Sequence, residues 1–339
     1  MTIRSFDSLS PTETLEIENG LSLVPRVKLI LTVYPSVSAS ATKPIDEWKL
    51  KRALTDFLKT SLSVSIVVPD EDLEIKRYKD LKKRKRDDSV AHGALCFRDL
   101  GFLRNEKEKE EDLKVLEKKF LDWRKYIVEK MDGIELNLEG YRYKLSVAVP
   151  ETDDFEGMKK AWQEFYAFGN RGYSRGGRQE PDTIILRGVP SRWFAEPRVS
   201  SKPSMLVTHT IFSSFGKIRN LSVAEDDDFG KDVDEDGGDL ISGLHCKIVV
   251  QFEKYGDFYS ALKVLCGRSL QKQGSRLRAD YEVTWAKDSL FRNLSSQGKG
   301  KSERIPEVAG GQYRNEAYGR GRYNSQFPSD DTPRKRFKE

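Results

Sequence analysis

Hydrophobic residues recur at strand and helix spacing in two separate regions of the chain, at about 21–150 and 181–290. In the first region, alternating and β-branched runs indicate strands, and apolar residues three and four apart indicate amphipathic helices. The predicted strands are 27–34, 64–68, 94–103 and 143–149, and the predicted helices begin at Asp46 and at about Leu113. This order is β-α-β-β-α-β, the split βαβ arrangement of ferredoxin-like domains.

The second region repeats this order with clearer alternation. Its predicted strands are 183–190, 218–223, 244–252 and 281–285, with helices at 207–216 and 257–265. Successive side chains of a strand point to opposite faces of the sheet. Those expected under the helices are Ile184, Leu186, Cys246, Ile248, Val250 and Phe252, and those expected on the open face are Ile185, Arg187, His245, Lys247 and Val249. The predicted fold class is α+β, with two ferredoxin-like domains.

The remaining segments have the composition of linkers and tails. Residues 1–20 are predicted to be a flexible N-terminus, and 291–339 a disordered basic tail of Gly, Ser, Asn, Gln and charged residues. Residues 151–180 form a linker with an amphipathic helix at about 153–168. Because so short a helix is marginal alone, we expect it to dock on its own chain or, alternatively, on a partner.

The charges of the chain nearly cancel, because 59 Lys and Arg stand against 54 Asp and Glu for a net charge of +5. They are nevertheless segregated into basic and acidic runs. The first domain carries a basic insertion at 76–90, and the second carries an acidic loop at 225–239 with nine carboxylates. Consecutive basic residues are typical of nuclear import signals, although a solvated loop has the same pattern. The residues expected to act in nuclear import are Lys82, Lys83, Arg84, Lys85, Arg86, Arg334, Lys335 and Arg336.

Several function classes find no support in the sequence. No run approaches the roughly 18–20 apolar residues that cross a membrane. The three histidines are isolated and no nucleophile motif is present, so we expect neither an enzyme nor a small-molecule substrate. Residues 232–237 match half of a calcium loop, but Gly243 stands where the bidentate Glu belongs. No Cys and His spacing completes a zinc site, and no cofactor or metal is expected.

A more specific signal lies in the second region. The passage from Phe212 to Ile218, followed by the strand end at Val250–Phe252, resembles an RNA recognition motif. Together with residues 181–195 and 215–220, it resembles the splicing-factor-like family of A-kinase anchor protein 17A. The resemblance implies a nuclear protein that binds RNA or splicing factors and influences splice-site choice. A kinase regulatory subunit is not an expected partner, because no amphipathic stripe follows residue 290.

The predicted RNA platform departs from the usual motif, in which aromatic side chains on the open face stack on bases at about 1–3 kcal/mol each. The corresponding positions here are Ile185, Lys247 and Val249. We expect Arg187, Lys247 and Arg278 to meet phosphates and Trp285 to supply one aromatic face. The Arg-Gly segments are expected to add affinity through Arg171, Arg175, Arg178, Arg320 and Arg322, although a flexible linker would have the same composition.

Two functional hypotheses follow. The first is a nuclear RNA-binding adaptor in pre-mRNA splicing, whose partners are RNA and splicing factors. The second is a protein–protein scaffold of splicing complexes, in which the aromatic-poor sheet binds protein instead of RNA. Trp193 and Phe194, just after the first strand of the second domain, are a candidate partner-binding pair or, alternatively, a plug that closes the domain edge.

Overall fold

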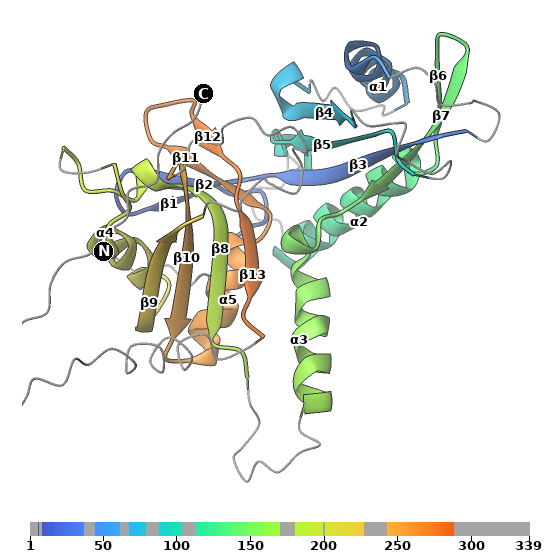
Figure 1. Cartoon of the computed structure of the whole chain (residues 1–339). Helices are drawn as coiled ribbons and strands as arrows, with labels where there is room; N and C mark the ends of the chain where they lie inside the picture. The colour runs from blue at the N-terminus through green and yellow to red at the C-terminus, as the bar shows by residue number, and fades with distance from the viewer. Residues whose placement is uncertain are drawn as a thin grey trace, which may run out of the picture. The chain divides into compact units, whose positions relative to one another are not determined.

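The computed structural model describes residue 6 and residues 9–36, 45–61, 68–78, 88–103, 113–169, 180–198, 201–226 and 243–287. All of these belong to one compact unit, Met1–Asn293. They form three antiparallel sheets and five α-helices (Figure 1). Two of the sheets correspond to the two predicted domains, and the third joins the ends of the described chain.

The C-terminal sheet has the strand order β13-β8-β10-β9. The first and third strands of the motif therefore lie at its centre, as the β-α-β-β-α-β order requires. All of its strand pairs are antiparallel. Its elements are β8 (Thr183–Pro190), α4 (Met205–Ser213), β9 (Ile218–Glu225), β10 (His245–Phe252), α5 (Tyr255–Leu265) and β13 (Glu282–Trp285).

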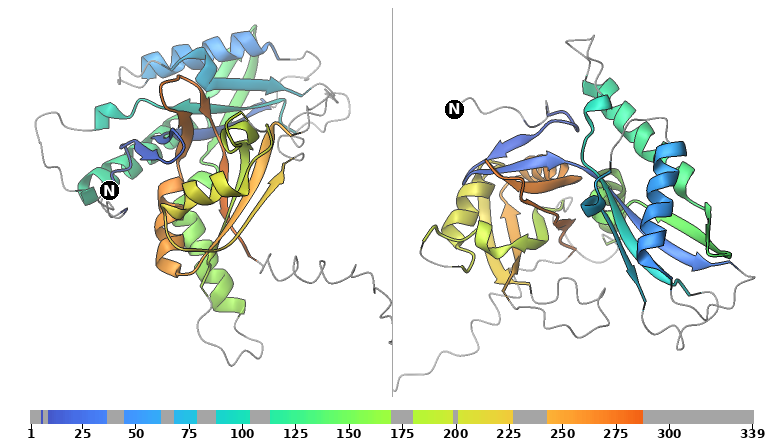
Figure 2. Two further views of the ribbon diagram at one scale, coloured as in Figure 1. Left: turned by 90° about the vertical axis from the view of Figure 1, so that its left-hand side faces the viewer. Right: turned by 90° about the horizontal axis from the view of Figure 1, so that it is seen from above.

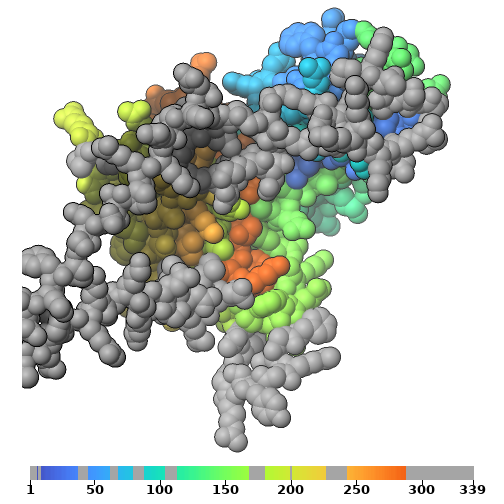
Figure 3. All heavy atoms as spheres, viewed as in Figure 1, coloured from blue at the N-terminus to red at the C-terminus, as the bar shows by residue number. Residues whose placement is uncertain are grey.

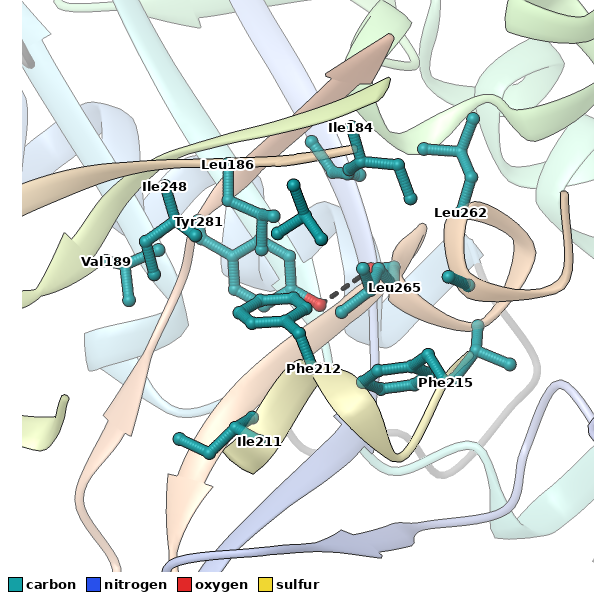
Figure 4. Packing of buried hydrophobic residues seen from close by; sticks show 14 of the residues in the cluster. Ile184, Leu186, Val189, Ile211, Phe212, Phe215, Ile248, Leu262, Leu265 and Tyr281 are labelled. Carbon is teal, nitrogen blue, oxygen red and sulfur yellow. Dashed lines mark hydrogen bonds between the residues drawn. The ribbon is translucent and has the colours of Figure 1, made fainter. Parts of the chain in front are cut away.

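The alternation of β8 and β10 builds the core under α4 and α5. All six side chains predicted to face the helices are at most 1% exposed, namely Ile184, Leu186, Cys246, Ile248, Val250 and Phe252. Phe212 of α4 and Phe258 of α5 complete this cluster from the helix side. The buried Tyr281 hydroxyl donates to the Leu265 carbonyl at 2.7 Å, so its polar atom is satisfied inside the core (Figure 4).

The turn after α4 requires a glycine. A Cβ on Gly216 would lie 2.4 Å from the Cβ of Asp257, at the start of α5. This close approach lets the Asp257 carboxylate accept a hydrogen bond from the backbone N–H of Lys217 at 3.2 Å. A residue without a side chain is therefore required at the end of the predicted helix, because α4 and α5 approach each other closely there.

The N-terminal sheet has the order β4-β5-β3-β7-β6. Its first four strands again place the first and third strands of the motif at the centre. Its elements are β3 (Val27–Pro35), α1 (Glu47–Ser61), β4 (Leu73–Arg77), β5 (Ala91–Phe97), α2 (Leu113–Met131), β6 (Glu135–Leu138) and β7 (Tyr141–Ala148). The hairpin strand β6 extends the sheet beyond the predicted four strands.

The buried residues of this sheet and its helices recur at the spacing expected for strands and helices. Asp46 caps α1, because its carboxylate accepts from the backbone N–H groups of Trp48 and Lys49 at 3.0 and 3.3 Å. The second strand lies at Leu73–Arg77, later than the predicted 64–68, of which only residue 68 is described. The buried side chains of β3, α1 and α2 are Val27, Leu29, Leu31, Val33, Leu50, Leu54, Leu58, Leu116, Ile127 and Met131.

The third sheet joins the start of the chain to the C-terminal domain. It has the order β1-β2-β11-β12, with β1 (Leu15–Ile17), β2 (Leu21–Pro25), β11 (Arg268–Lys272) and β12 (Arg278–Ala279). Figure 2 shows the blue β1–β2 hairpin beside the orange β11. Leu23 lies opposite Leu270, and both are buried in the C-terminal core.

This arrangement differs from the predicted flexible segment at 1–20, because Leu15–Ile17 is a paired strand. The partner of β1 is the adjacent β2, and β2 pairs in turn with β11 some 250 residues further along the chain. That distant pairing, which holds the hairpin on the C-terminal domain, leaves no local mark in the sequence. Directly after β2, the chain continues through Arg26 into β3, so one extended segment serves both domains.

The linker helix α3 (Phe155–Gly169) docks on the C-terminal domain. Its Met158 and Trp162 are buried in that core. The Trp162 ring meets Phe258 of α5 in an edge contact, with centroids 5.7 Å apart. Aromatic packing of this kind supplies the tertiary stabilisation that an isolated helix of this length lacks.

A network of ion pairs, buried at Arg26 and Asp153 and partly exposed at Arg98 and Asp280, ties the two domains together. Arg98, at the end of β5, donates to Asp72 at 2.6 Å and to Asp280 at 3.1 and 3.2 Å. Arg26 pairs with Asp153 at 3.2 Å and lies 3.7 Å from Asp280. Burial by itself would raise the pKa of Asp280, but the two guanidinium groups outweigh it and hold that pKa well below its usual value.

Candidate nucleic-acid interface

The outer face of the C-terminal sheet carries aliphatic and small polar side chains at its centre. Ile185 on β8 lies opposite Val249 on β10 and Thr284 on β13, and Val249 lies opposite Ser222 on β9. Val249 is 8% exposed and Ile185 is half-buried. This row occupies the place where an RNA recognition motif stacks bases, and it contains no aromatic ring.

Arg187, expected to meet phosphate, is held by an acidic partner. Its guanidinium donates to both carboxylate oxygens of Asp226, at 2.9 and 3.3 Å. The backbone N–H of Gly188 donates to the same carboxylate at 3.3 Å. Asp226 stands where β9 ends and the acidic run begins, and its side chain is 3% exposed. Part of the acidic run therefore neutralises the sheet's own arginine.

The other expected phosphate contacts are not brought together. Lys247 lies on the outer face, half-buried and opposite Ala224 of β9. Arg278 is exposed, but it belongs to β12 in the third sheet. Of the predicted basic residues that the structure describes, only Arg187 and Lys247 share the outer face of the C-terminal sheet.

Trp285 is placed on the opposite face from the expectation. Its register partner is the inward-facing Ile184, so it lies on the helix side of the sheet and is 7% exposed. Its ring contacts Phe165 and Trp162 of α3, with centroids 5.5 and 6.4 Å apart. Because α3 packs against β13, this tryptophan completes a core and offers no stacking face to a base. The sequence pattern did not show this packing.

The aromatic pair after β8 separates into two environments. Phe194 is 1% exposed and stacks on Phe212, with ring centroids 6.4 Å apart. Phe194 therefore packs inside the domain, in the position expected of a side chain that closes the domain edge. Trp193 is half-buried in the short 3₁₀ turn Ser191–Trp193, and its carbonyl accepts from the Asn19 side chain at 3.1 Å. Trp193 remains available at the surface.

The remaining predicted basic residues lie outside the described residues. These are the Arg-Gly positions Arg171, Arg175, Arg178, Arg320 and Arg322, and the import positions Lys82, Lys83, Arg84, Lys85, Arg86, Arg334, Lys335 and Arg336.

The outer face of the N-terminal sheet has the features that the C-terminal face lacks. Tyr34 on β3 is 37% exposed and lies opposite the exposed Lys144 on β7. His92 on β5 lies opposite the exposed Lys76 on β4. The His92 ring contacts the Tyr78 ring, with centroids 4.7 Å apart. Aromatic faces interleaved with lysines suit the bases and phosphates of single-stranded RNA.

Sequence reasoning missed this face, although a signal was present. The burial of β3 alternates, with Val27, Leu29, Leu31 and Val33 inward, so Tyr34 had to point outward. The last two residues of strand β4, Lys76 and Arg77, were instead assigned to the basic insertion at 76–90. Register between strands, which places Tyr34 beside Lys144, could not be deduced from either strand alone.

Towards the domain junction the same face becomes acidic. The charged residues that line a hollow of about 200 Å³ there are two cations, Lys28 and Arg98, and five carboxylates, Glu71, Asp72, Glu74, Asp280 and Glu282. Carboxylates around this hollow would repel a phosphate backbone. The part of the face that suits RNA is therefore the end with Tyr34 and Lys144.

The strand order of both sheets, with helices on one face and an open outer face, defines the class of RNA-recognition-motif-like proteins. A model of the AKAP-17A-like RNA-binding domain family matches residues 116–306, more than half of the chain. The chain therefore belongs to the AKAP-17A-like RNA-binding domain family.

The chain is also similar to human A-kinase anchor protein 17A. The two are 29% identical over 148 residues, which cover 42% of this chain and 21% of the relative. The similarity thus concerns about a fifth of the relative's length. Among the described residues, no helix has the length and apolar character needed to cross a membrane, and no group of three or more potential metal ligands is found.

Proposed function

We propose that this chain is a nuclear RNA-binding adaptor that acts in the regulation of pre-mRNA splicing, with RNA and splicing-factor proteins as its partners. The observation that carries the proposal is the match of residues 116–306 to an RNA-binding domain family. The splicing role rests on the family resemblance of residues 181–195 and 215–220, and the nuclear location on the basic runs at 82–86 and 334–336.

Within this function, we assign most of the base stacking to the N-terminal sheet. Its outer face presents Tyr34 and the Tyr78–His92 ring pair next to Lys76 and Lys144. Stacking contributes about 1–3 kcal/mol per base, and each phosphate contact adds salt-sensitive affinity. The Arg-Gly segments at 171–178 and 319–323 are proposed to add contacts that do not depend on RNA sequence.

Crosslinking in cells tests RNA binding. The intact chain is irradiated and its covalently bound RNA is compared with that of a Lys247→Glu variant and of a variant that lacks 171–178 and 319–323. Recovery of RNA at the background level from the intact chain would refute the function. Replacing Lys82 to Arg86 with alanine and deleting Arg334 to Arg336 should reduce the nuclear fraction, and an unchanged fraction would refute the import signals.

A second candidate function, a protein scaffold of splicing complexes, is favoured by one observation at the C-terminal sheet. Arg187 is neutralised by Asp226, and the row of Ile185 and Val249 is aliphatic. Such a face suits a protein surface better than a base. If crosslinking persists in the Lys247→Glu variant and is lost only on deletion of the Arg-Gly segments, the C-terminal sheet is a protein surface.

A further inference from the structure

A groove of about 790 Å³ lies between the loop that follows β8 and the β11–β12 hairpin. It is separate from the row of Ile185 and Val249. Its basic lining residues are Arg192, Arg198 and Lys272, and its apolar ones include Trp193, Pro197 and Leu277. In Figure 3 the yellow-green loop that forms one wall projects at the surface.

Within the part of the chain that the structure describes, the side chains of the three cations of the groove have no partner. The side chains of Arg192, Arg198 and Lys272 are exposed, and none forms a hydrogen bond or ion pair within the described part of the chain. Elsewhere in this domain, Arg187 is paired with a carboxylate. The carboxylate of Glu196, which also lines the groove, accepts from the Ser204 hydroxyl at 2.8 Å. Three cations against the one carboxylate of Glu196 leave the described lining of the groove with a net positive charge, which favours an anionic ligand.

The groove is also apolar where it is deepest. Leu21 and Ala195 are buried at its base, at 1% and 5% exposure. At its rim Leu277 is 62% exposed and Trp193 is half-buried. An exposed leucine beside a tryptophan provides area for an aliphatic or aromatic side chain of a ligand.

Three distant segments hold the groove in shape. The Asn19 side chain donates to the Trp193 carbonyl at 3.1 Å, which ties the N-terminal hairpin to the loop. The backbone N–H of Ser191 donates to the Leu244 carbonyl at 2.9 Å. Arg198 has a φ of 64°, a left-handed conformation that is uncommon outside glycine and is found preferentially at functional sites. The loop is therefore anchored at its start and strained near its end.

We propose that this groove is a docking site for an acidic peptide segment of a partner protein, in which carboxylates flank an apolar side chain. The carboxylates meet Arg192, Arg198 and Lys272, and the apolar side chain packs on Trp193 and Leu277. A peptide fits better than RNA, because the half-buried indole and the leucine offer a pocket for a side chain more than an open face for a base. This site goes beyond RNA binding and supplies a protein contact for an adaptor.

Selection of binding peptides from a random library, with the full chain as the target, tests the proposal. A random 12-residue displayed library is panned against the chain, and the enriched peptides are synthesised with a fluorescein label and measured by fluorescence anisotropy. We expect enriched peptides to contain several Asp or Glu residues around a Leu, Ile, Phe or Trp. Their affinity should fall at least about tenfold in an Arg192→Glu, Lys272→Glu double variant, and also in Leu277→Ser.

The matched control is Lys247→Glu, which reverses a charge on the outer sheet face and should leave peptide affinity unchanged. All the altered groove residues are exposed, and thermal unfolding confirms that each variant is folded. Enrichment of peptides without acidic residues, or equal affinity for the double variant and the parent, would overturn the proposal. If the chain selects no peptide and its RNA crosslinks map to residues 191–198, the groove is an RNA site and the proposal also fails.

Discussion

The two main sheets of this protein share one strand order and differ in the chemistry of their outer faces. In the C-terminal sheet, Ile185 and Val249 lie at the centre of the face, and Arg187 is bound to Asp226. In the N-terminal sheet, Tyr34 stands beside Lys144. Strand order determines where an open face is. The residues at alternate positions, and their neighbours across the strands, determine what that face can bind.

The two sheets are joined by the ion pairs of Arg26 and Arg98 with Asp280. Breaking this junction should have the largest effect on stability. Asp280→Ala leaves Arg26 and Arg98 without a shared carboxylate. Loss of one partner of a fully buried ion pair costs about 3–5 kcal/mol of unfolding free energy. Because the Asp280 side chain is 28% exposed, we expect a smaller loss of about 2–3 kcal/mol. Urea unfolding followed by circular dichroism measures it. The control Lys125→Ala removes an exposed pair with Glu129 and should cost less than about 0.5 kcal/mol. A loss below about 1 kcal/mol for Asp280→Ala would show that the junction contributes little.

Acid should weaken the same junction. The pKa of Asp280 is lowered in the folded chain, because Arg26 and Arg98 outweigh the effect of burial. Its stabilising contribution is therefore complete above its unfolded pKa of about 3.9 and is lost as the pH falls below that value toward the folded pKa. Between about pH 5 and pH 2, unfolding free energy should fall more steeply in the parent than in Asp280→Asn. Parallel curves for the two proteins would contradict this assignment.

The difference between the faces predicts where base stacking is lost. Tyr34→Ala should weaken binding of a single-stranded oligoribonucleotide by about 1–3 kcal/mol, roughly 5- to 150-fold. Ile185→Ala on the C-terminal face is the matched control and should change affinity less than about twofold. Fluorescence anisotropy at fixed salt measures both. A larger effect of Ile185→Ala than of Tyr34→Ala would reverse the assignment of the two faces.

The comparison can also be sharpened by making the C-terminal face resemble the N-terminal one. Ile185→Phe places an aromatic ring at the stacking position of β8. We expect RNA affinity to rise by about 1 kcal/mol, or fivefold, since a single base can stack on it. The control Ile185→Leu keeps the apolar volume without the ring. Equal affinities of the Phe and Leu variants would mean that RNA does not reach this face.

The smallest expected effect concerns a single phosphate contact. Lys144→Ala should reduce the slope of log affinity against log salt by about 0.7, the value for one phosphate of a single strand. The comparison uses titrations at several salt concentrations, with Lys125→Ala as the control. An unchanged slope would exclude a phosphate contact at Lys144.

The elements and the inward faces could be predicted because they depend on local periodicity. Ile184, Leu186 and Ile248 are buried as their alternation required. Trp285 was assigned to the wrong face, because the sequence does not show which residue of β8 it lies opposite. Its contact with α3 joins segments far apart in the chain. The pairing of Arg187 with Asp226 was also missed, since it joins residues 39 positions apart.

By itself, the sequence determined the two β-α-β-β-α-β regions, their cores and the charge blocks, because hydrophobic period and charge runs are local properties. Only the tertiary structure decided that the N-terminal hairpin joins the C-terminal core, that Arg26 and Arg98 share Asp280, and that Trp193, Lys272 and Leu277 line one groove. These features depend on register and on contacts between segments far apart in the chain. Such contacts follow from packing and leave no period along the chain.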